Sequence, residues 1–181
     1  MKPALLSCLL LLLASEASAH RLDEYLQATR ISVATNRIDL SIYLTPGVAV
    51  ADRLLAIIDK NRDGQISGGE RAAYLQRVLR DIKVELDETA LALSPTNTSF
   101  PTVGEVKAGV GVIRIKATAA IGQLSVGNHT LKLTNAHLPT ISVYLVNALT
   151  PNHPAIQIMK QARDELQQNY RLEFGVSPSR P

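Results

Sequence analysis

The chain is organised around one polar stretch of twelve residues, Asp59-Lys60-Asn61-Arg62-Asp63-Gly64-Gln65-Ile66-Ser67-Gly68-Gly69-Glu70. Oxygen-bearing side chains fall at its positions 1, 3, 5, 9 and 12, whereas position 6 is a glycine and position 8 an isoleucine. Glycine adopts backbone conformations that are closed to other residues, so Gly64 allows the chain to turn sharply. The stretch is therefore predicted to fold back on itself and to gather its oxygen atoms.

Oxygen atoms in this spacing suit calcium, a hard cation that takes about six to eight oxygen ligands in a loose shell. We expect the first three acidic or amide side chains to give one oxygen each, and position 7 to give its backbone carbonyl. Position 9 is expected to bind directly or through a water, and position 12 with both carboxylate oxygens. The predicted ion is Ca²⁺, and its predicted ligands are Asp59, Asn61, Asp63, Gln65, Ser67 and Glu70.

With every ligand position filled, the stretch resembles the EF-hand of the calmodulin superfamily. The resemblance covers roughly residues 47–80 and implies a helix on each side of the loop. Apolar residues recur at helical spacing in 48–58 and again in 71–80, which supports those two helices. The alternative is a polar turn between two helices that binds no metal.

The loop is single, although EF-hands usually pair through the residue at position 8. Either two molecules pair through Ile66, or Ile66 and the two helices pack on the rest of the domain. We expect packing, because the helical unit is tethered at both ends, at Pro46 and near Ile82.

Outside residues 47–81, the sequence reads as short strands. Ile38, Leu40, Ile42 and Leu44 alternate with polar residues, which is typical of a half-buried strand, and residues 26–35 are expected to pair with it as a hairpin. The apolar run 141–149 is interpreted as a central strand buried on both faces. Residues 94–111 are interpreted as a long loop that leaves room for an irregular strand around Phe100. About eight such strands predict a mainly β fold, an antiparallel, immunoglobulin-like β-sandwich with the EF-hand unit inserted after its second strand.

The N-terminus has the pattern of a signal peptide. Lys2 precedes a short apolar run, Leu5–Leu13, and small residues allow cleavage between Ala19 and His20. The alternative is an uncleaved N-terminal anchor. We therefore expect residues 1–19 to be removed, residues 20–176 to form one domain, and residues 177–181 to be a disordered tail.

The cysteine usage indicates the compartment. The only cysteine, Cys8, lies inside the predicted signal peptide, so the mature chain has no disulfide. An exported domain without disulfides fits a bacterial periplasm better than a eukaryotic secreted domain. We predict a periplasmic or secreted protein.

Composition and motifs exclude several classes of function. The formal net charge of +3 comes from scattered basic residues, so nucleic-acid binding is not expected. The sequence has no catalytic nucleophile motif or phosphate-binding loop, so an enzyme is not predicted either. No second apolar run is long enough to cross a bilayer, and we predict a monomer whose partner is calcium. A protein partner in the periplasm or at the membrane stays open.

A weaker resemblance concerns the predicted mature start, His20-Arg-Leu-Asp-Glu-Tyr-Leu-Gln-Ala-Thr29. Together with a β-rich domain, it is similar to the extracytoplasmic domains of hydrogenase/urease accessory (HupE/UreJ-type) membrane proteins. Those proteins carry a membrane part after the soluble domain. Since no such span is found here, the resemblance implies a free-standing relative rather than a transporter.

A second candidate function, copper or nickel binding, rests on His20, the first residue of the predicted mature chain. After cleavage, His20 would offer its amine and a ring nitrogen to one metal ion, with His129, His137 or His153 completing the site. The alternative is that His20 is simply the first residue after the cut and that the other histidines lie in surface loops.

Overall fold

The computed structural model describes residues 23–178. The predicted signal peptide, His20 and residues 179–181 of the predicted tail lie outside the described residues. The described elements are, in chain order, β1 (Tyr25–Val33), β2 (Arg37–Pro46), α2 (Val48–Ile58), α3 (Gly68–Asp81), β3 (Ile82–Leu86), β4 (Thr89–Leu91), β5 (Ser94–Ser99), α4 (Val103–Lys107), β6 (Ile113–Ala120), β7 (Gly127–Asn135), β8 (Ser142–Ala148), β9 (Ile156–Arg163) and β10 (Asn169–Val176).

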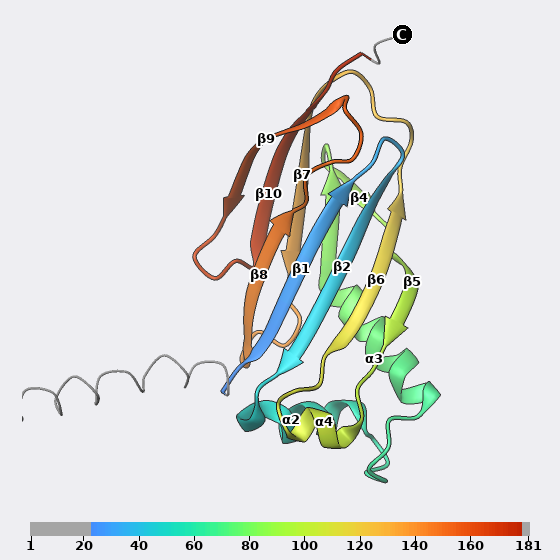
Figure 1. Cartoon of the computed structure of the whole chain (residues 1–181), viewed down its shortest axis with the longest axis vertical. Coiled ribbons are helices and arrows are strands. Elements are labelled where there is room, and N and C mark those ends of the chain that lie inside the picture. The colour runs from blue at the N-terminus through green and yellow to red at the C-terminus, as the bar shows by residue number, and fades with distance from the viewer. Residues whose placement is uncertain (1–22, 179–181) are drawn as a thin grey trace, which may run out of the picture.

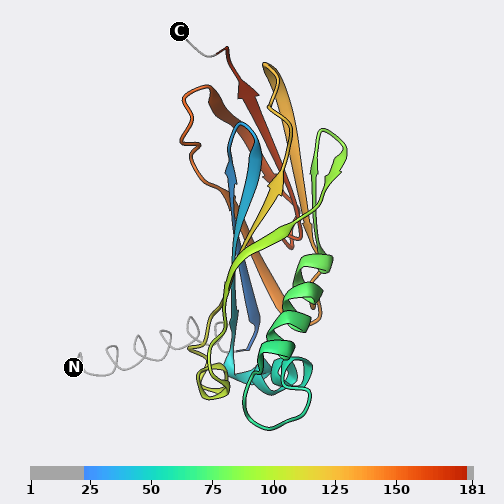
Figure 2. The ribbon, with the colours of Figure 1, turned by 90° about the vertical axis from the view of Figure 1, so that its right-hand side faces the viewer.

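The strands form two five-stranded sheets, one in the order β5-β6-β2-β1-β8 and the other in the order β4-β3-β7-β10-β9. Figures 1 and 2 show them as two layers, with the helices together at the end where β1 begins. Neighbouring strands run antiparallel, except that β1 and β8 are parallel. The predicted mainly β architecture is confirmed.

The core lies between the layers because each strand buries every second side chain. In β2, buried and half-buried residues alternate along the strand, which places Ile38, Leu40 and Ile42 on its inner face. Leu131 of β7 and Leu172 of β10 join the same cluster from the opposite sheet. One apolar core therefore joins the two sheets.

Two expectations about the second half of the chain were wrong. The run 141–149 contains β8, which is an edge strand with Leu145 45% exposed, rather than a buried central strand. Residues 94–111 contain β5 and α4 rather than one long loop. Every residue of β5 is exposed, so this strand is held by backbone pairing to β6 and gives no apolar pattern to detect.

A close approach fixes α4 against α2. Gly109, in the turn after α4, has φ +70°, and a Cβ there would lie 2.9 Å from Cγ2 of Val48 at the start of α2. Val106 of α4 is fully buried. The two helices are therefore held together by a contact that only glycine permits at position 109.

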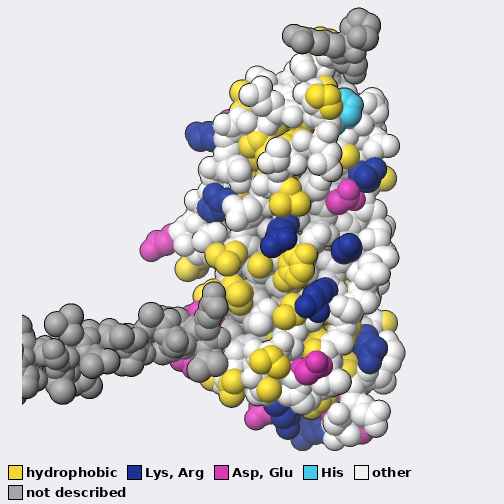
Figure 3. Space-filling view, viewed as in Figure 1, with side chains coloured by type: hydrophobic (Ala, Val, Ile, Leu, Met, Phe, Trp, Pro, Cys, Tyr) yellow, Lys and Arg dark blue, Asp and Glu magenta, His cyan; other side chains and the backbone are white. Residues whose placement is uncertain are grey.

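The face of the molecule seen in Figure 1 is mixed in chemistry. Lys and Arg side chains are separated there by polar and apolar atoms (Figure 3). In the described chain, the guanidinium carbon of Arg30 lies 5.3 Å from the ring centre of Tyr43. Within residues 23–178, no helix is both long enough and apolar enough to cross a bilayer.

Candidate metal-binding loop

The loop is set between two helices of defined ends. Helix α2 ends at Ile58, as predicted, and the backbone N–H of Asp59 still donates to the carbonyl of Leu55. Helix α3 begins at Gly68, three residues before the predicted start. The reason is a capping box, in which Ser67 and Glu70 each bind the other's backbone N–H and offset the weak helix propensity of the glycines.

In the first half of the loop, side-chain oxygens turn inward onto the backbone. Asp59 Oδ2 accepts from the N–H of Gly64 at 3.1 Å, and Asn61 Oδ1 accepts from the N–H of Asp63 at 3.2 Å. Asp63 Oδ1 accepts from the N–H of Gln65 at 2.8 Å, and its Oδ2 accepts from the Asn61 amide. Gly64, with φ +79°, makes this fold possible. The first three predicted ligands therefore lie around one tight turn.

Glu70 closes the loop from its other end. Its Oε1 accepts from the backbone N–H of Lys60 at 2.7 Å, so position 12 lies next to position 2. Its Oε2 accepts from the N–H and the hydroxyl of Ser67 at 2.9 and 2.8 Å. These hydrogen bonds, those of Ser67 foremost, lower the pKa of Glu70 and keep it ionised at neutral pH.

The loop contains one buried oxygen whose hydrogen-bonding capacity is unused. Asp59 is only 7% exposed, and among the described residues its Oδ1 has no hydrogen-bond partner. An unsatisfied buried polar group costs about 1–3 kcal/mol, and a charged one costs more. A cation bound at this oxygen would remove that cost. The donor set is entirely oxygen, so the residues present fit calcium and not a softer metal.

The structure does not gather all six predicted ligands into one preformed centre. In the described part of the chain, no group of three or more His, Cys, Asp or Glu side chains is arranged to hold a metal. Asp63 and Glu70 are engaged with loop N–H groups and Ser67 caps α3, while the Gln65 side chain is exposed as expected for a backbone ligand. To bind a metal ion, these oxygens would have to leave the N–H and hydroxyl groups that now donate to them and turn toward the ion.

Ile66 packs inward, as the sequence analysis expected. It is 5% exposed and belongs to the core cluster, together with Leu54 and Ile58 of α2 and Tyr74 and Val78 of α3. The alternative, in which two molecules pair through Ile66, would require this side chain to be exposed.

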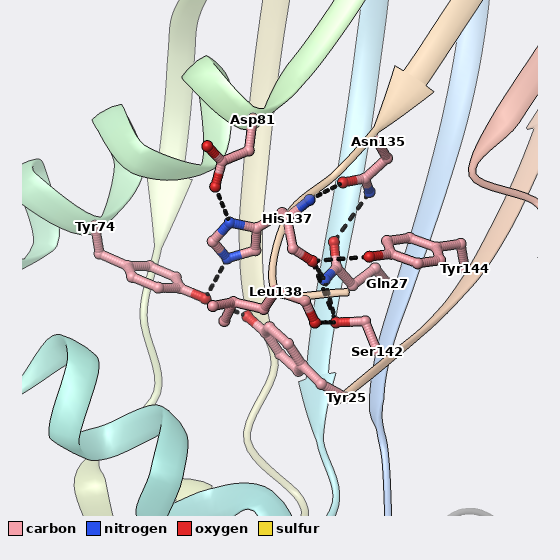
Figure 4. Close-up of polar contacts among 9 residues, drawn as sticks. All are labelled: Tyr25, Gln27, Tyr74, Asp81, Asn135, His137, Leu138, Ser142 and Tyr144. Atoms are coloured by element: carbon pink, nitrogen blue, oxygen red, sulfur yellow. Dashed lines mark hydrogen bonds and ion pairs between the residues drawn. The ribbon is translucent and has the colours of Figure 1, made fainter. Parts of the chain in front are cut away.

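A second cluster, which the sequence analysis missed, lies where α3 meets the sheets (Figure 4). His137 is fully buried, rather than in a surface loop. Its Nδ1 lies 2.8 Å from Asp81 Oδ2, and its Nε2 lies 2.9 Å from the hydroxyl of Tyr74, which lies 2.7 Å from the hydroxyl of Tyr25. We call these four residues the polar chain.

The polar chain is supported from the other side by β1, β7 and β8. The backbone carbonyl of His137 accepts from Gln27 at 2.7 Å and from the hydroxyl of Tyr144 at 3.0 Å, and its N–H donates to Asn135. Burial lowers the pKa of His137 in spite of the nearby Asp81 carboxylate. One feature of the sequence could have indicated this buried polar cluster. Gln27 is a polar residue at a position of β1 where the alternation of the strand requires an inward side chain.

Within residues 23–178, the two other histidines, His129 and His153, do not form a common site with His137. His129 is buried elsewhere, with Nδ1 2.6 Å from Asp87 Oδ2 and Nε2 2.9 Å from the carbonyl of Ser125. His153 accepts from the N–H of Ala155 through Nδ1. Both ring nitrogens of His129 and of His137 are thus engaged, so neither ring offers a free nitrogen to a copper or nickel ion.

No protein-family model, no curated protein and no solved structure matches this chain. The two family resemblances therefore rest on the residues that suggested them, and the candidate site rests on its geometry.

Proposed function

We propose that this chain binds one calcium ion in the loop Asp59–Glu70, and that the ion stabilises an exported domain. In this proposal the helix–loop–helix is a single EF-hand inserted in an immunoglobulin-like β-sandwich. The ligands are those predicted from the sequence, with the Asp59, Asn61 and Asp63 side chains on one side of the ion and Glu70 closing the other.

The observation that carries the proposal is the unpartnered Oδ1 of Asp59. A buried carboxylate oxygen is normally hydrogen-bonded, and here the rest of the loop supplies no donor to it. The N–H groups of the loop instead orient the remaining oxygens around the same turn. A divalent cation at Oδ1 would satisfy Asp59, and its charge would offset the negative charge of that buried carboxylate.

A stabilising role is favoured over a sensor role because α2 and α3 are fixed in place by the core on one side and, for α2, by α4 on another. Ile66 and the helix stripes are part of the core, and α4 covers α2 through the contact at Gly109. A sensor EF-hand opens its helix pair to expose an apolar groove. Opening here would break the core of the whole domain.

The proposed location follows from the predicted signal peptide and from the lack of cysteine after it. Free calcium is far more abundant outside the cytosol, and EF-hands of extracellular modules have dissociation constants of about 10⁻⁴ to 10⁻³ M. The loop has only three carboxylates, so we expect a Kd of about 10⁻⁵ to 10⁻³ M.

The test is isothermal titration of calcium into the metal-free chain, comparing Asp59→Asn with Asp52→Asn. Asp52 is an acidic residue of α2 whose side chain is 89% exposed and lies outside the loop. We expect binding in the stated range, weakened at least tenfold by Asp59→Asn and unchanged by Asp52→Asn. A folded chain that gives no heat at several millimolar calcium, or equal affinities for the two variants, would contradict the proposal.

A further inference from the structure

Helix α3 connects the metal-binding loop to the polar chain. Glu70 lies in its first turn, Tyr74 one turn later, and Asp81 is its last residue. Glu70 closes the loop, whereas Tyr74 and Asp81 hold the two ring nitrogens of His137. The helix that completes the loop is therefore the same helix that is fastened to the sheets through one buried imidazole (Figure 4).

The donor and the acceptor of each hydrogen bond in the polar chain can be assigned by starting from the Asp81 carboxylate. Ionised Asp81 only accepts, so the proton of neutral His137 lies on Nδ1 and Nε2 is an acceptor. Tyr74 then donates to Nε2, and Tyr25 donates to the hydroxyl oxygen of Tyr74. Two hydroxyl protons fill the two contacts, at 2.9 and 2.7 Å, and each group in the chain is satisfied.

A second proton on His137 breaks this arrangement. With Nε2 protonated, three protons compete for the two contacts among His137, Tyr74 and Tyr25. Tyr25 and His137 are fully buried, so the surplus hydroxyl proton has no water to bind. Protonation therefore leaves one buried tyrosine hydroxyl without an acceptor, which disfavours the close approach of Tyr25 and Tyr74 and with it the present position of Tyr74 on α3.

The charges that face His137 lie on α3. Asp81 favours the protonated ring and Arg77 opposes it. The other groups packed against the residue are neutral, namely Tyr25 and Gln27 of β1, Asn135 of β7 and Tyr144 of β8. Burial outweighs the attraction of Asp81, in agreement with the lowered pKa of His137.

We propose that proton uptake by His137 and calcium binding in the loop oppose each other through α3, which makes the calcium affinity of the chain pH-dependent. The proposal rests on the proposed calcium function. When His137 is neutral, Tyr74 holds α3 so that Glu70 reaches the N–H of Lys60. When His137 is protonated, the surplus hydroxyl proton drives Tyr74 away from Tyr25, the first turn of α3 moves with Tyr74, and Glu70 closes the loop less well.

The first measurement is the calcium Kd of the chain by titration calorimetry at about pH 7.5 and about pH 5.5. We expect a higher Kd at the lower pH, with the rise approaching about tenfold once the pH is below the pKa of His137 in the calcium-bound chain. Titration of Glu70 does not explain such a change, because the hydrogen bonds of Ser67 and Lys60 lower its pKa.

Linkage requires the reverse effect as well, and it can be measured without any variant. NMR titration of the His137 ring should give a pKa that is about one unit lower with saturating calcium than with a chelator, the counterpart of a tenfold change in Kd. An identical pKa in both states overturns the proposal.

Variants separate His137 from other titrating groups. His137→Gln should remove the pH dependence of the Kd, whereas His153→Gln, which changes an exposed histidine, should retain it. If His137→Gln does not fold, the NMR titration of the unaltered chain decides. A measurable Kd that does not vary with pH contradicts the coupling and leaves calcium binding intact. Absence of binding at pH 7.5 contradicts both.

Discussion

At the scale of single residues, Glu70 both closes the candidate metal-binding loop and caps α3, and these two roles can be separated by comparison with Glu105. Glu105 forms the same capping box with Thr102 at the start of α4, but lies outside the loop. Both carboxylates accept from the N–H and the hydroxyl of a residue three positions earlier. Glu105 is therefore a natural control for Glu70.

We expect Glu70→Gln to raise the calcium Kd more than any other single loop substitution, at least tenfold, because it removes charge from the ligand with two oxygens. Glu105→Gln should leave the Kd unchanged, while both variants lose a similar and small amount of stability because each weakens one capping box. Calorimetry and urea unfolding of the metal-free proteins measure the two effects. Equal Kd values for the two variants would assign Glu70 to capping alone.

His129 gives the opposite pH dependence from His137. Burial opposes protonation of His129, but its hydrogen bonds to Asp87 and to the carbonyl of Ser125 outweigh burial and raise its pKa. Both partners accept, so both ring nitrogens must donate and the ring is charged.

The raised pKa of His129 means that its contribution to stability is complete below the ordinary histidine pKa of about 6.5, and is lost as pH rises through the folded value. We expect unfolding in urea to show this loss as pH rises above about 6.5, and His129→Gln to abolish it. His153→Gln serves as the exposed control. A pH profile that is the same for His129→Gln and the unaltered chain would show that this pair does not contribute.

At the scale of elements, the packing of α4 on α2 depends on Gly109, and it makes a quantitative prediction. Gly109→Ala places a methyl group 2.9 Å from Val48 in a backbone conformation with φ +70°, so we expect a loss of about 1–3 kcal/mol in urea unfolding. Gly122→Ala adds the same methyl where no atom lies within 4 Å, and should change stability by less than about 0.5 kcal/mol.

Elements with a local pattern were predictable, and those defined by distant contacts were not. The spacing of apolar residues predicted α2 within its observed limits and most of β2, because each buries one face. The six candidate ligands were also proposed from local spacing alone, since all lie within twelve residues, and their binding of a metal stays a prediction. β5 has no buried face, so its sequence shows no apolar alternation that would predict a strand. The edge position of β8 depends on which strands lie beside it, and the local sequence does not contain that information.

The polar chain illustrates the same limit for the candidate site. It joins Tyr25, Tyr74, Asp81 and His137, and the contact between the two tyrosine hydroxyls spans 49 residues of sequence. Nothing in the neighbourhood of His137 marks it as buried. The Thr102–Glu105 capping box, in contrast, was a local signal for α4 that the sequence analysis did not use.

At the scale of the whole molecule, we expect bound calcium to stabilise the packing of α2, the loop and α3 on the two sheets. A metal that binds only the folded chain stabilises it by about 2.7 kcal/mol at a hundredfold excess over Kd. We expect a higher melting temperature with calcium than with a chelator, and the same monomer mass in sedimentation at several protein concentrations. A calcium-dependent dimer would favour pairing through the loop, and an unchanged melting temperature would exclude a structural site.

The parallel pairing of β1 with β8 bears on the order in which the domain can assemble. β2 follows β1 directly and forms a hairpin with it, but the hydrogen bond from Gln27 to Ser142 closes a loop of 115 residues. During synthesis, which starts at the N-terminus, one edge of β1 therefore stays unpaired until β8 has been made. Because closing so long a loop is slow, that edge is the part of the nascent protein most open to wrong pairing.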